Sequence, residues 1–199
     1  MPMTPLDACT AFQAVRGDAI VVCTMTSMNL LDVLAPDQPL TLSSVPLMGG
    51  AAALGLGIAL AQPERRVIVL DGDSSLLMEL GVLATVVGGM PQNFHHFVFA
   101  NRVQFNGNFA LKLPGDGKFD FAATARAAGY RDCARWDSAE SLLQLESWLQ
   151  RAGPTFVELE MDASESRLSA ANPPGQMPDV RFARMGVEAA GIRSVLVGV

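Results

Sequence analysis

The segment from residue 67 to residue 103 constrains the fold more than any other part of the sequence. Val67–Leu70 is an apolar run rich in β-branched residues, which is typical of a strand buried on both faces of a parallel sheet. The run leads directly into the acidic and hydroxyl residues 71–75 (DGDSS), and a second apolar run, Phe97–Ala100, leads into Asn101. Polar side chains at the ends of two buried strands predict an α/β protein with a ligand site at those ends.

Between these two strands, the spacing of apolar residues predicts a single helix. Its apolar face consists of four residues at helical spacing, namely Leu76, Leu80, Leu83 and Val87. Gly88-Gly89 and then Pro91 are expected to end the helix, as a left-handed glycine cap followed by a proline would.

Asp73 and Asn101 are expected to lie close together, because ligands of open parallel sheets bind along the edge where the strands end. A carboxylate and an amide oxygen suit a hard cation such as Mg²⁺, which takes its other ligands from phosphate and water. The free backbone N–H groups of Ser74 and Ser75, at the helix start, are expected to hold the phosphate. The segment therefore predicts a metal–diphosphate site.

The same residues resemble the signature of thiamine diphosphate enzymes, in which Gly-Asp-Gly is followed further along the chain by Asn-Asn. Here Gly72-Asp73-Ser74 is followed by Ala100-Asn101, so Ser74 replaces one glycine and Ala100 one asparagine, and neither replacement removes a metal ligand. The resemblance implies thiamine diphosphate and Mg²⁺ as cofactors, with the metal held by Asp73, Asn101 and the backbone carbonyl of Val103. It places Gly72, Ser74, Ser75 and Asn101 around the cofactor.

Two hydroxyl residues after the first expected strand, Ala19–Cys23, extend the resemblance. Thiamine enzymes of the 2-oxoacid decarboxylase type carry a Gly-Thr-Ser-like turn here, which Thr26 and Ser27 match, with Met25 in place of the glycine. From the residues alone, a helix cap is an equally good interpretation of these hydroxyl groups.

Residues 46–50 (PLMGG) match a further turn of the family, Gly-Ser-Met-Gly-like, ahead of an expected small-residue helix at Ala51–Ala61. The resemblance implies that Met48 bends the cofactor, that the carbonyl of Pro46 receives its aminopyrimidine, and that Gly49 also contacts it. Proline keeps its C=O, so the acceptor remains. Within the helix, Gly55 and Gly57 each cost roughly 1 kcal/mol relative to alanine, which indicates close helix packing.

Three longer phrases indicate which branch of the family the chain resembles. LMGGAAALGLGIALA, VIVLDGDSSLLMELGVLATV and FDFAATARAAGY are similar to sulfopyruvate decarboxylase beta subunits and phosphonopyruvate decarboxylases. The resemblance implies a parallel sheet of about six strands between helices, and non-oxidative cleavage of a 2-oxo acid. It also implies an alpha-type, pyrimidine-binding partner subunit that supplies the catalytic glutamate, in a dimer or higher oligomer. A homodimer of this chain alone is expected to be inactive.

Composition limits the other possibilities. Of the 199 residues, 50% are apolar and 17% charged, which excludes a disordered chain and allows a substantial core in one domain, residues 1–199. The net charge of −6 argues against nucleic acid as a partner. The three cysteines form neither a disulfide framework nor a metal spacing. The longest apolar run is too short to cross a membrane, and the start lacks a signal-peptide pattern, so a cytoplasmic protein is expected.

The remaining chain is expected to alternate helices, strands and loops. Helices are predicted at 6–15, at 119–128 and from a capping pair, Asp137 and Glu140, to residue 151; the last clear strand is 155–160. The Gly-, Asn- and Pro-rich residues 102–117 predict a mobile loop beside the site, suited to act as a lid. Residues 162–199 form a C-terminal extension of ambiguous structure.

The sequence also fits other functions less well than it fits a thiamine diphosphate enzyme. The run VIVLDGDSS also fits aspartate-nucleophile phosphatases, with Asp71 phosphorylated and Asp73 as general acid, but the lysine and acidic pair that such enzymes need are missing from strand ends. A dinucleotide site at Gly49-Gly50 lacks G-x-G-x-x-G. A non-catalytic subunit on the same fold remains an alternative because of the motif departures.

His95 and His96 precede the expected strand, which favours a structural role. Arg102 suits an anionic substrate or a structural role equally.

Overall fold

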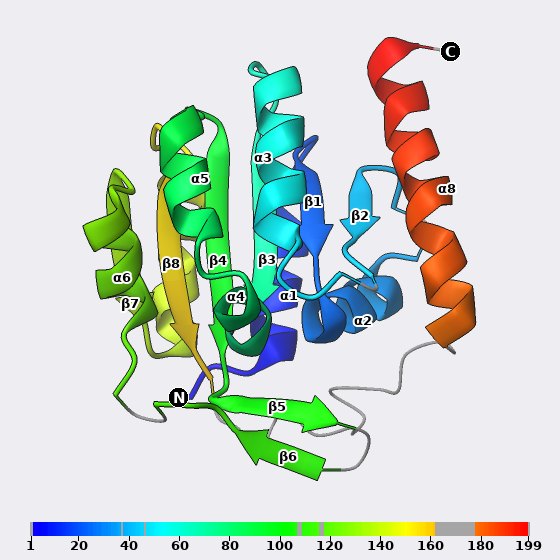
Figure 1. The fold of residues 1–199 in the computed structure, drawn as a ribbon. Coiled ribbons are helices and arrows are strands. Elements are labelled where there is room, and N and C mark those ends of the chain that lie inside the picture. The colour runs from blue at the N-terminus through cyan, green and yellow to red at the C-terminus, as the bar shows by residue number, and fades with distance from the viewer. Residues whose placement is uncertain are drawn as a thin grey trace.

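The computed structural model describes residues 2–36, 38–45, 47–106, 109–115, 118–161 and 178–198. Its centre is a six-stranded sheet in which every pair of neighbouring strands is parallel (Figure 1). In spatial order the strands are β2 (Thr41–Ser43), β1 (Ile20–Cys23), β3 (Val67–Gly72), β4 (Phe94–Ala100), β8 (Thr155–Glu160) and β7 (Asp132–Trp136). The predicted fold class, a parallel sheet of about six strands between helices, is confirmed.

Helices cover both faces of the sheet, and each layer has its own apolar core. One core contains residues of α1 (Pro5–Val15), α2 (Met25–Leu34) and α7 (Leu145–Trp148), beside the 3₁₀ helix η1 (Ala139–Gln144). The other contains residues of α3 (Ala51–Ala61), α4 (Asp73–Met78), α5 (Val82–Gly89) and α6 (Phe121–Ala128). Alternate residues of β3 enter opposite cores, since Ile68 and Leu70 pack in the first and Val67 and Val69 in the second. The strand is therefore buried on both faces, as its composition predicted.

The last helix, α8 (Pro178–Val197), lies beside the edge strand β2 (Figure 1). Ile192 brings it into the second core. The expected C-terminal extension thus ends in a helix, while residues 162–177 lie outside the described part. No helix in the described ranges has the length and apolar character needed to cross a membrane.

Within the segment 102–117, predicted to be a mobile loop, residues 103–106 and 109–112 are strands instead. β5 (Val103–Asn106) and β6 (Phe109–Lys112) pair antiparallel, with Val103 opposite Lys112 (Figure 1). β5 ends at Asn106, and Gly107, which also suggested a loop, lies outside the described residues. The prediction was wrong because turn residues were interpreted without the apolar alternation on either side of them.

The helix predicted across residues 76–87 is two helices. α4 ends at Met78, Glu79 leaves the helical region with φ −133° and ψ 44°, and α5 begins after Gly81. The left-handed C-cap of α5 is Met90, with φ 43°, rather than the predicted glycine. Leu76 and Leu83 are still both buried in the second core, so an intact apolar period concealed the break.

Element boundaries also differ elsewhere. β4 begins at Phe94, which places His95 and His96 inside the strand rather than before it. No Asp137–Glu140 capping pair forms: the residue that precedes η1 is Ser138, without a side-chain cap bond. β2 and β7 were not predicted because they are short and partly polar. By contrast, α3 and β8 begin and end where their sequence patterns placed them.

Candidate functional site

The strand ends of β1, β3 and β4 define the candidate site, on the lower side of the sheet in Figure 1, near α2, α4 and the β5–β6 hairpin. Asp73 is the first residue of α4, directly after β3, and Asn101 follows β4 directly. β3 and β4 are neighbours, with Gly72 opposite Phe99. Parallel pairing therefore brings the two predicted metal ligands to the same place.

Asp73 is a buried carboxylate, with only 2% of its surface exposed. Its Oδ2 accepts a hydrogen bond from the backbone N–H of Arg102 at 2.6 Å, and its Oδ1 accepts one from the N–H of Ser74 at 2.7 Å. Burial raises the pKa of Asp73 to about 6, although both N–H donors oppose that rise. Two donors leave lone pairs on both oxygens for a cation, and a cation would relieve the cost of the buried charge.

The residues after β4 form a tight turn beside that carboxylate. Asn101 is 8% exposed, and its Oδ1 accepts the N–H of Val103 at 3.1 Å. Arg102 has a left-handed backbone, with φ 62°, and this conformation accompanies the bond from its N–H to Asp73. The bond from Arg102 N–H thus links Asp73 to the turn that contains Asn101 and Val103, and the role of these three residues as metal ligands stays a prediction.

The side chain of Arg102 is used within the protein. Its guanidinium pairs with the carboxylate of Glu158 and donates to the carbonyl of Phe119 at 3.0 Å. Glu158, on β8, is 0% exposed and also accepts the N–H of Ala122 at the start of α6, at 3.1 Å. Of the two roles considered for Arg102, the structural one is therefore confirmed.

Sequence reasoning missed Glu158 altogether. The available signal was a carboxylate in the middle of the apolar strand TFVELE, where an acidic residue is rarely buried unless it is paired.

The N–H groups at the start of α4 differ from the prediction. The N–H of Ser74 is not free for a phosphate, because Asp73 Oδ1 accepts it. Ser75 is buried, and its Oγ accepts the N–H of Gly49 at 2.9 Å. The side chain of Asp73, the first residue of α4, bonds locally to the next N–H, and the sequence pattern alone did not account for this. Gly72 caps the helix with extended backbone, and its own N–H bonds to Asp71 Oδ1.

The turn before α3 reaches the same place from the other side. Gly49 has a left-handed backbone, with φ 86°, and a Cβ here would lie closer than 3.0 Å to the side chain of Glu79. Gly49 therefore suits a position where the backbone approaches α4 closely. Met48 is half-buried. Pro46, the predicted acceptor of the aminopyrimidine, lies outside the described residues.

Of the two hydroxyl residues at the start of α2, Ser27 fits the helix-cap interpretation. Ser27 is buried, and its Oγ donates to the carbonyls of Thr24 and Leu70 at 2.8 and 3.0 Å. The same Oγ accepts the N–H of Thr24 at 3.2 Å. Thr26 is half-buried in the first turn of α2, beside the ends of β1 and β3. Its predicted contact with the cofactor stays a prediction.

The histidines and Asp71 are part of the interior. Asp71 is 1% exposed, and its Oδ2 lies 3.5 Å from Nε2 of the buried His96. His95 bonds to Thr155 Oγ1 at 2.9 Å, and burial lowers its pKa to about 4. A nucleophile has to be reachable by its substrate, so the buried Asp71 does not fit the phosphatase interpretation.

The donor set fits the cofactor implied by the resemblance. Asp73 offers a carboxylate, Asn101 an amide oxygen and Val103 a backbone carbonyl, all oxygen ligands of the kind that Mg²⁺ prefers. Among the described residues no group of three or more His, Cys, Asp or Glu is placed to hold a metal. A site with one carboxylate relies on phosphate and water for the remaining ligands, as Mg²⁺–diphosphate sites do.

Comparison with known proteins agrees with this geometry. Residues 19–159 match the family described as thiamine pyrophosphate enzyme, C-terminal TPP binding domain. The chain is 39% identical over 145 residues to a phosphonopyruvate decarboxylase from Streptomyces viridochromogenes, covering 72% of this chain and 36% of that protein. It is 31% identical over 161 residues to sulfopyruvate decarboxylase subunit beta from Methanothermobacter thermautotrophicus, covering 80% of this chain and 82% of that one.

A solved structure extends the likeness to the fold. It is described as a thiamin diphosphate-dependent enzyme from Mycobacterium smegmatis and superposes with a TM-score of 0.68 at 25% identity, over 81% of this chain and 32% of that one. This chain therefore spans about a third of the length of that protein and of the phosphonopyruvate decarboxylase, and most of the length of the beta subunit. Because the family match covers most of the chain, the resemblance is confirmed, and this chain belongs to the thiamine pyrophosphate enzymes, to their C-terminal TPP-binding domain.

Proposed function

We propose that this chain is the diphosphate- and Mg²⁺-binding subunit of a heteromeric 2-oxoacid decarboxylase of the sulfopyruvate or phosphonopyruvate type. One observation carries the proposal. The buried carboxylate of Asp73 meets the turn 101–103 at the carboxyl ends of β3 and β4, through the 2.6 Å bond from Arg102 N–H to Asp73 Oδ2. This junction of the two halves of the family signature is where a Mg²⁺–diphosphate group would bind.

The residues of this chain would hold and orient the cofactor. Asp73, Asn101 and the carbonyl of Val103 would bind Mg²⁺, and the turn at Met48-Gly49 lies next to α4 through the bond from Gly49 N–H to Ser75 Oγ. When bound, the cofactor would supply the chemistry, with its thiazolium carbanion as the nucleophile toward the 2-oxo carbon and its thiazolium ring as the electron acceptor on loss of CO₂. The chain contributes a fixed position and a carboxylate shielded from water.

A second, pyrimidine-binding subunit completes the site in this proposal. The catalytic glutamate that activates the cofactor would come from that partner. Support comes from apolar side chains at the carboxyl edge of the sheet: Met25 at the start of α2, Leu47 after β2 and Met78 at the end of α4 are each about half exposed. Apolar side chains gathered around a half-built site suit the docking of a partner domain.

The substrate class follows from the relatives. Two of them are named for decarboxylases of sulfopyruvate and phosphonopyruvate, which are 2-oxo acids with a second anionic group. We propose a substrate of this class, cleaved in the cytoplasm. The residues that select the anionic group would lie largely on the partner.

Reconstitution tests the proposal. The full chain, alone and with its co-purified partner, is supplied with thiamine diphosphate and Mg²⁺, and CO₂ release from sulfopyruvate, phosphonopyruvate and pyruvate is measured. We expect release only with the partner present, and loss of it in Asp73→Asn but not in Glu64→Gln, an exposed carboxylate at the opposite end of the sheet. Cofactor binding without any release in the reconstituted complex would favour the non-catalytic subunit instead.

A further inference from the structure

The helix α8 lies outside the residues that match the family, and it supplies a carboxylate to the sheet edge. Glu188 Oε2 accepts the backbone N–H of Ser43 at 2.7 Å, and Oε1 accepts the Ser43 hydroxyl at 3.1 Å. The next N–H along the strand, that of Ser44, donates to Cys23 on β1, so the N–H of Ser43 faces the open side of the sheet. Glu188 therefore takes the place of a neighbouring strand.

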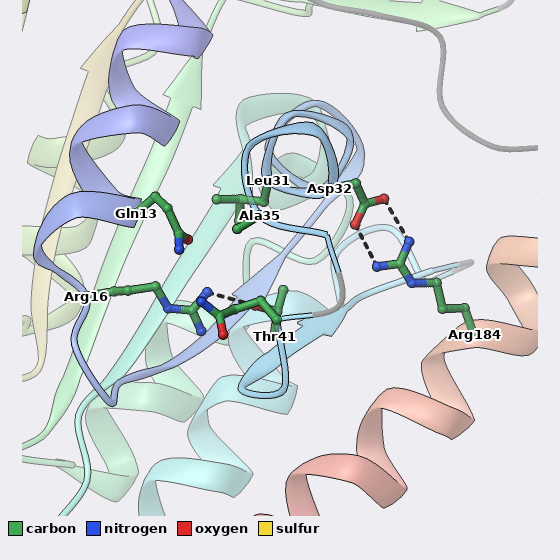
Figure 2. Close-up of a pocket in the computed structure, with 8 residues that line it drawn as sticks. Gln13, Arg16, Leu31, Asp32, Ala35, Thr41 and Arg184 are labelled. Carbon is green, nitrogen blue, oxygen red and sulfur yellow. Dashed lines mark hydrogen bonds and ion pairs between the residues drawn. The ribbon is translucent and has the colours of Figure 1, made fainter.

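An independent ion pair docks the helix. Arg184 pairs with Asp32 of α2 through two hydrogen bonds of 2.8 and 2.6 Å, which Figure 2 shows at one side of a small cavity. Nε of Arg184 also lies 2.6 Å from Glu188 Oε1, which fixes the glutamate in its place. Since Arg184 keeps Asp32 as a partner, a neutral residue at 188 would leave the helix docked.

Hydrogen bonds of the residues that follow Ser43 connect them to α4, the helix that begins with the candidate metal ligand Asp73. The hydroxyl of Ser44 donates to the carbonyl of Leu47 at 3.0 Å, and that carbonyl also accepts the N–H of Gly50 at 3.1 Å. Gly49 N–H then donates to Ser75 Oγ on α4, the helix that begins with Asp73. Contacts thus run from the edge of the sheet to the helix that carries the candidate metal ligand.

We propose that α8 is a clasp: through Ser43, Glu188 acts as a positioning residue that holds the turn 47–50 against α4. What the turn is positioned for rests on the proposed function, while the clasp itself is a property of the cofactor-free chain. Glu188 acts through Ser43 and touches no reacting atom. Its carboxylate fixes the position of Ser43 at the end of β2, and in this way the positions of Met48 and Gly49 further along the chain.

Hydrogen exchange of the cofactor-free full chain tests the clasp directly. In Glu188→Gln we expect the amides of Gly49 and Gly50 to exchange about tenfold faster, because a bond to a charged acceptor is replaced by a weaker neutral one. Amides of β4 and β8 should be unchanged, and so should all of these amides in the matched variant Glu64→Gln. Faster exchange confined to α8 and β2 would overturn the proposal. Ser43→Ala, which keeps the backbone bond, is the milder second variant and should give a smaller change at the same two amides.

Titration with thiamine diphosphate and Mg²⁺ then measures the consequence. With the partner present, we expect Glu188→Gln to weaken binding about tenfold with little change in the unfolding midpoint, whereas a purely structural residue would lower the midpoint and leave affinity unchanged. Equal affinity in wild type and Glu188→Gln would overturn the positioning role. If wild type itself fails to bind, the proposed function falls, and the exchange result alone decides whether the clasp exists.

Discussion

At the scale of single residues, Asp73 combines two opposing demands. It is buried, which disfavours its charge, and it accepts two backbone N–H groups, which favours it. Burial is the larger effect and raises the pKa to about 6. A bound divalent cation would favour the charged form of Asp73 and so offset the cost of burying its carboxylate.

The raised pKa makes stability depend on pH in a defined direction. Burial raises the pKa of Asp73 from 3.8 to about 6, so the folded state retains a proton that the unfolded state loses in between. This contribution is fully present below the unfolded pKa and is lost as the pH rises through the folded one. Compared with Asp73→Asn, which cannot ionise, wild type should lose up to about 3 kcal/mol between pH 4 and 7. Urea unfolding of both proteins without Mg²⁺ checks this, and a pH-independent difference between them would contradict it.

Two glutamates of β8 give a matched comparison. Glu158 is fully buried and bonded to Arg102 and Ala122, whereas Glu160, two residues on, pairs with Arg135 at the surface. Glu158→Ala should lower the free energy of unfolding by about 3 kcal/mol, because it leaves a partly buried cation and a buried N–H unpaired. Glu160→Ala should cost under about 1 kcal/mol. Chemical denaturation measures both, and equal losses would contradict the assigned roles.

The sequence predicts the placement of Asp73 and Asn101 because each directly follows a buried strand. It could not predict the pairing of Arg102 with Glu158, since that contact depends on a left-handed backbone at Arg102 and on β4 lying next to β8. Backbone conformation also determines the hydrogen-bond partner of the Ser74 N–H, which donates to the carboxylate of the preceding Asp73. Residue types at strand ends are therefore visible in sequence, while their hydrogen-bond partners depend on the fold.

At the scale of elements, the two glycines inside α3 differ sharply. A Cβ on Gly55 would lie closer than 3.0 Å to Val69 of β3, whereas one on Gly57 would have nothing within 4 Å. Close packing thus explains Gly55 and leaves Gly57 without a structural reason.

These glycines predict opposite effects of the same substitution. Gly55→Ala should lower the free energy of unfolding by about 1–3 kcal/mol, because the added methyl group enters a packed core. Gly57→Ala should raise it by up to about 1 kcal/mol, because alanine favours the helix. Thermal unfolding of the two variants provides the measurement. Destabilisation by both would show that the face of α3 carrying Gly57 is also packed.

Uniform elements were predictable and composite ones were not. α3 and β8 each have one pattern from end to end, so their bounds followed from the sequence. The region 73–89 preserves a helical period across a break at residues 79–81, so one helix was predicted where two exist. Periodicity records which side of the chain is buried, and it does not record whether the backbone remains helical between the buried residues.

At the scale of the whole molecule, this chain carries the diphosphate-binding part of the proposed cofactor site, and the proposed function assigns the activating glutamate to a partner. At the carboxyl edge of the sheet, the apolar side chains of Met25, Leu47 and Met78 are each about half exposed. A helix outside the family match borders the same turn from the β2 side. The proposed function therefore makes this chain one of two parts, whose activity depends on assembly.

The central claim is that Asp73 anchors thiamine diphosphate through Mg²⁺, and calorimetric titration tests it most directly. Thiamine diphosphate is titrated, with and without Mg²⁺, into the full chain together with its co-purified partner, as wild type, Asp73→Asn and the charge-matched control Glu64→Gln. The account predicts binding that requires Mg²⁺, is lost in Asp73→Asn and is retained in Glu64→Gln. Absence of binding in the complete assembly, or equal binding by Asp73→Asn, would contradict it.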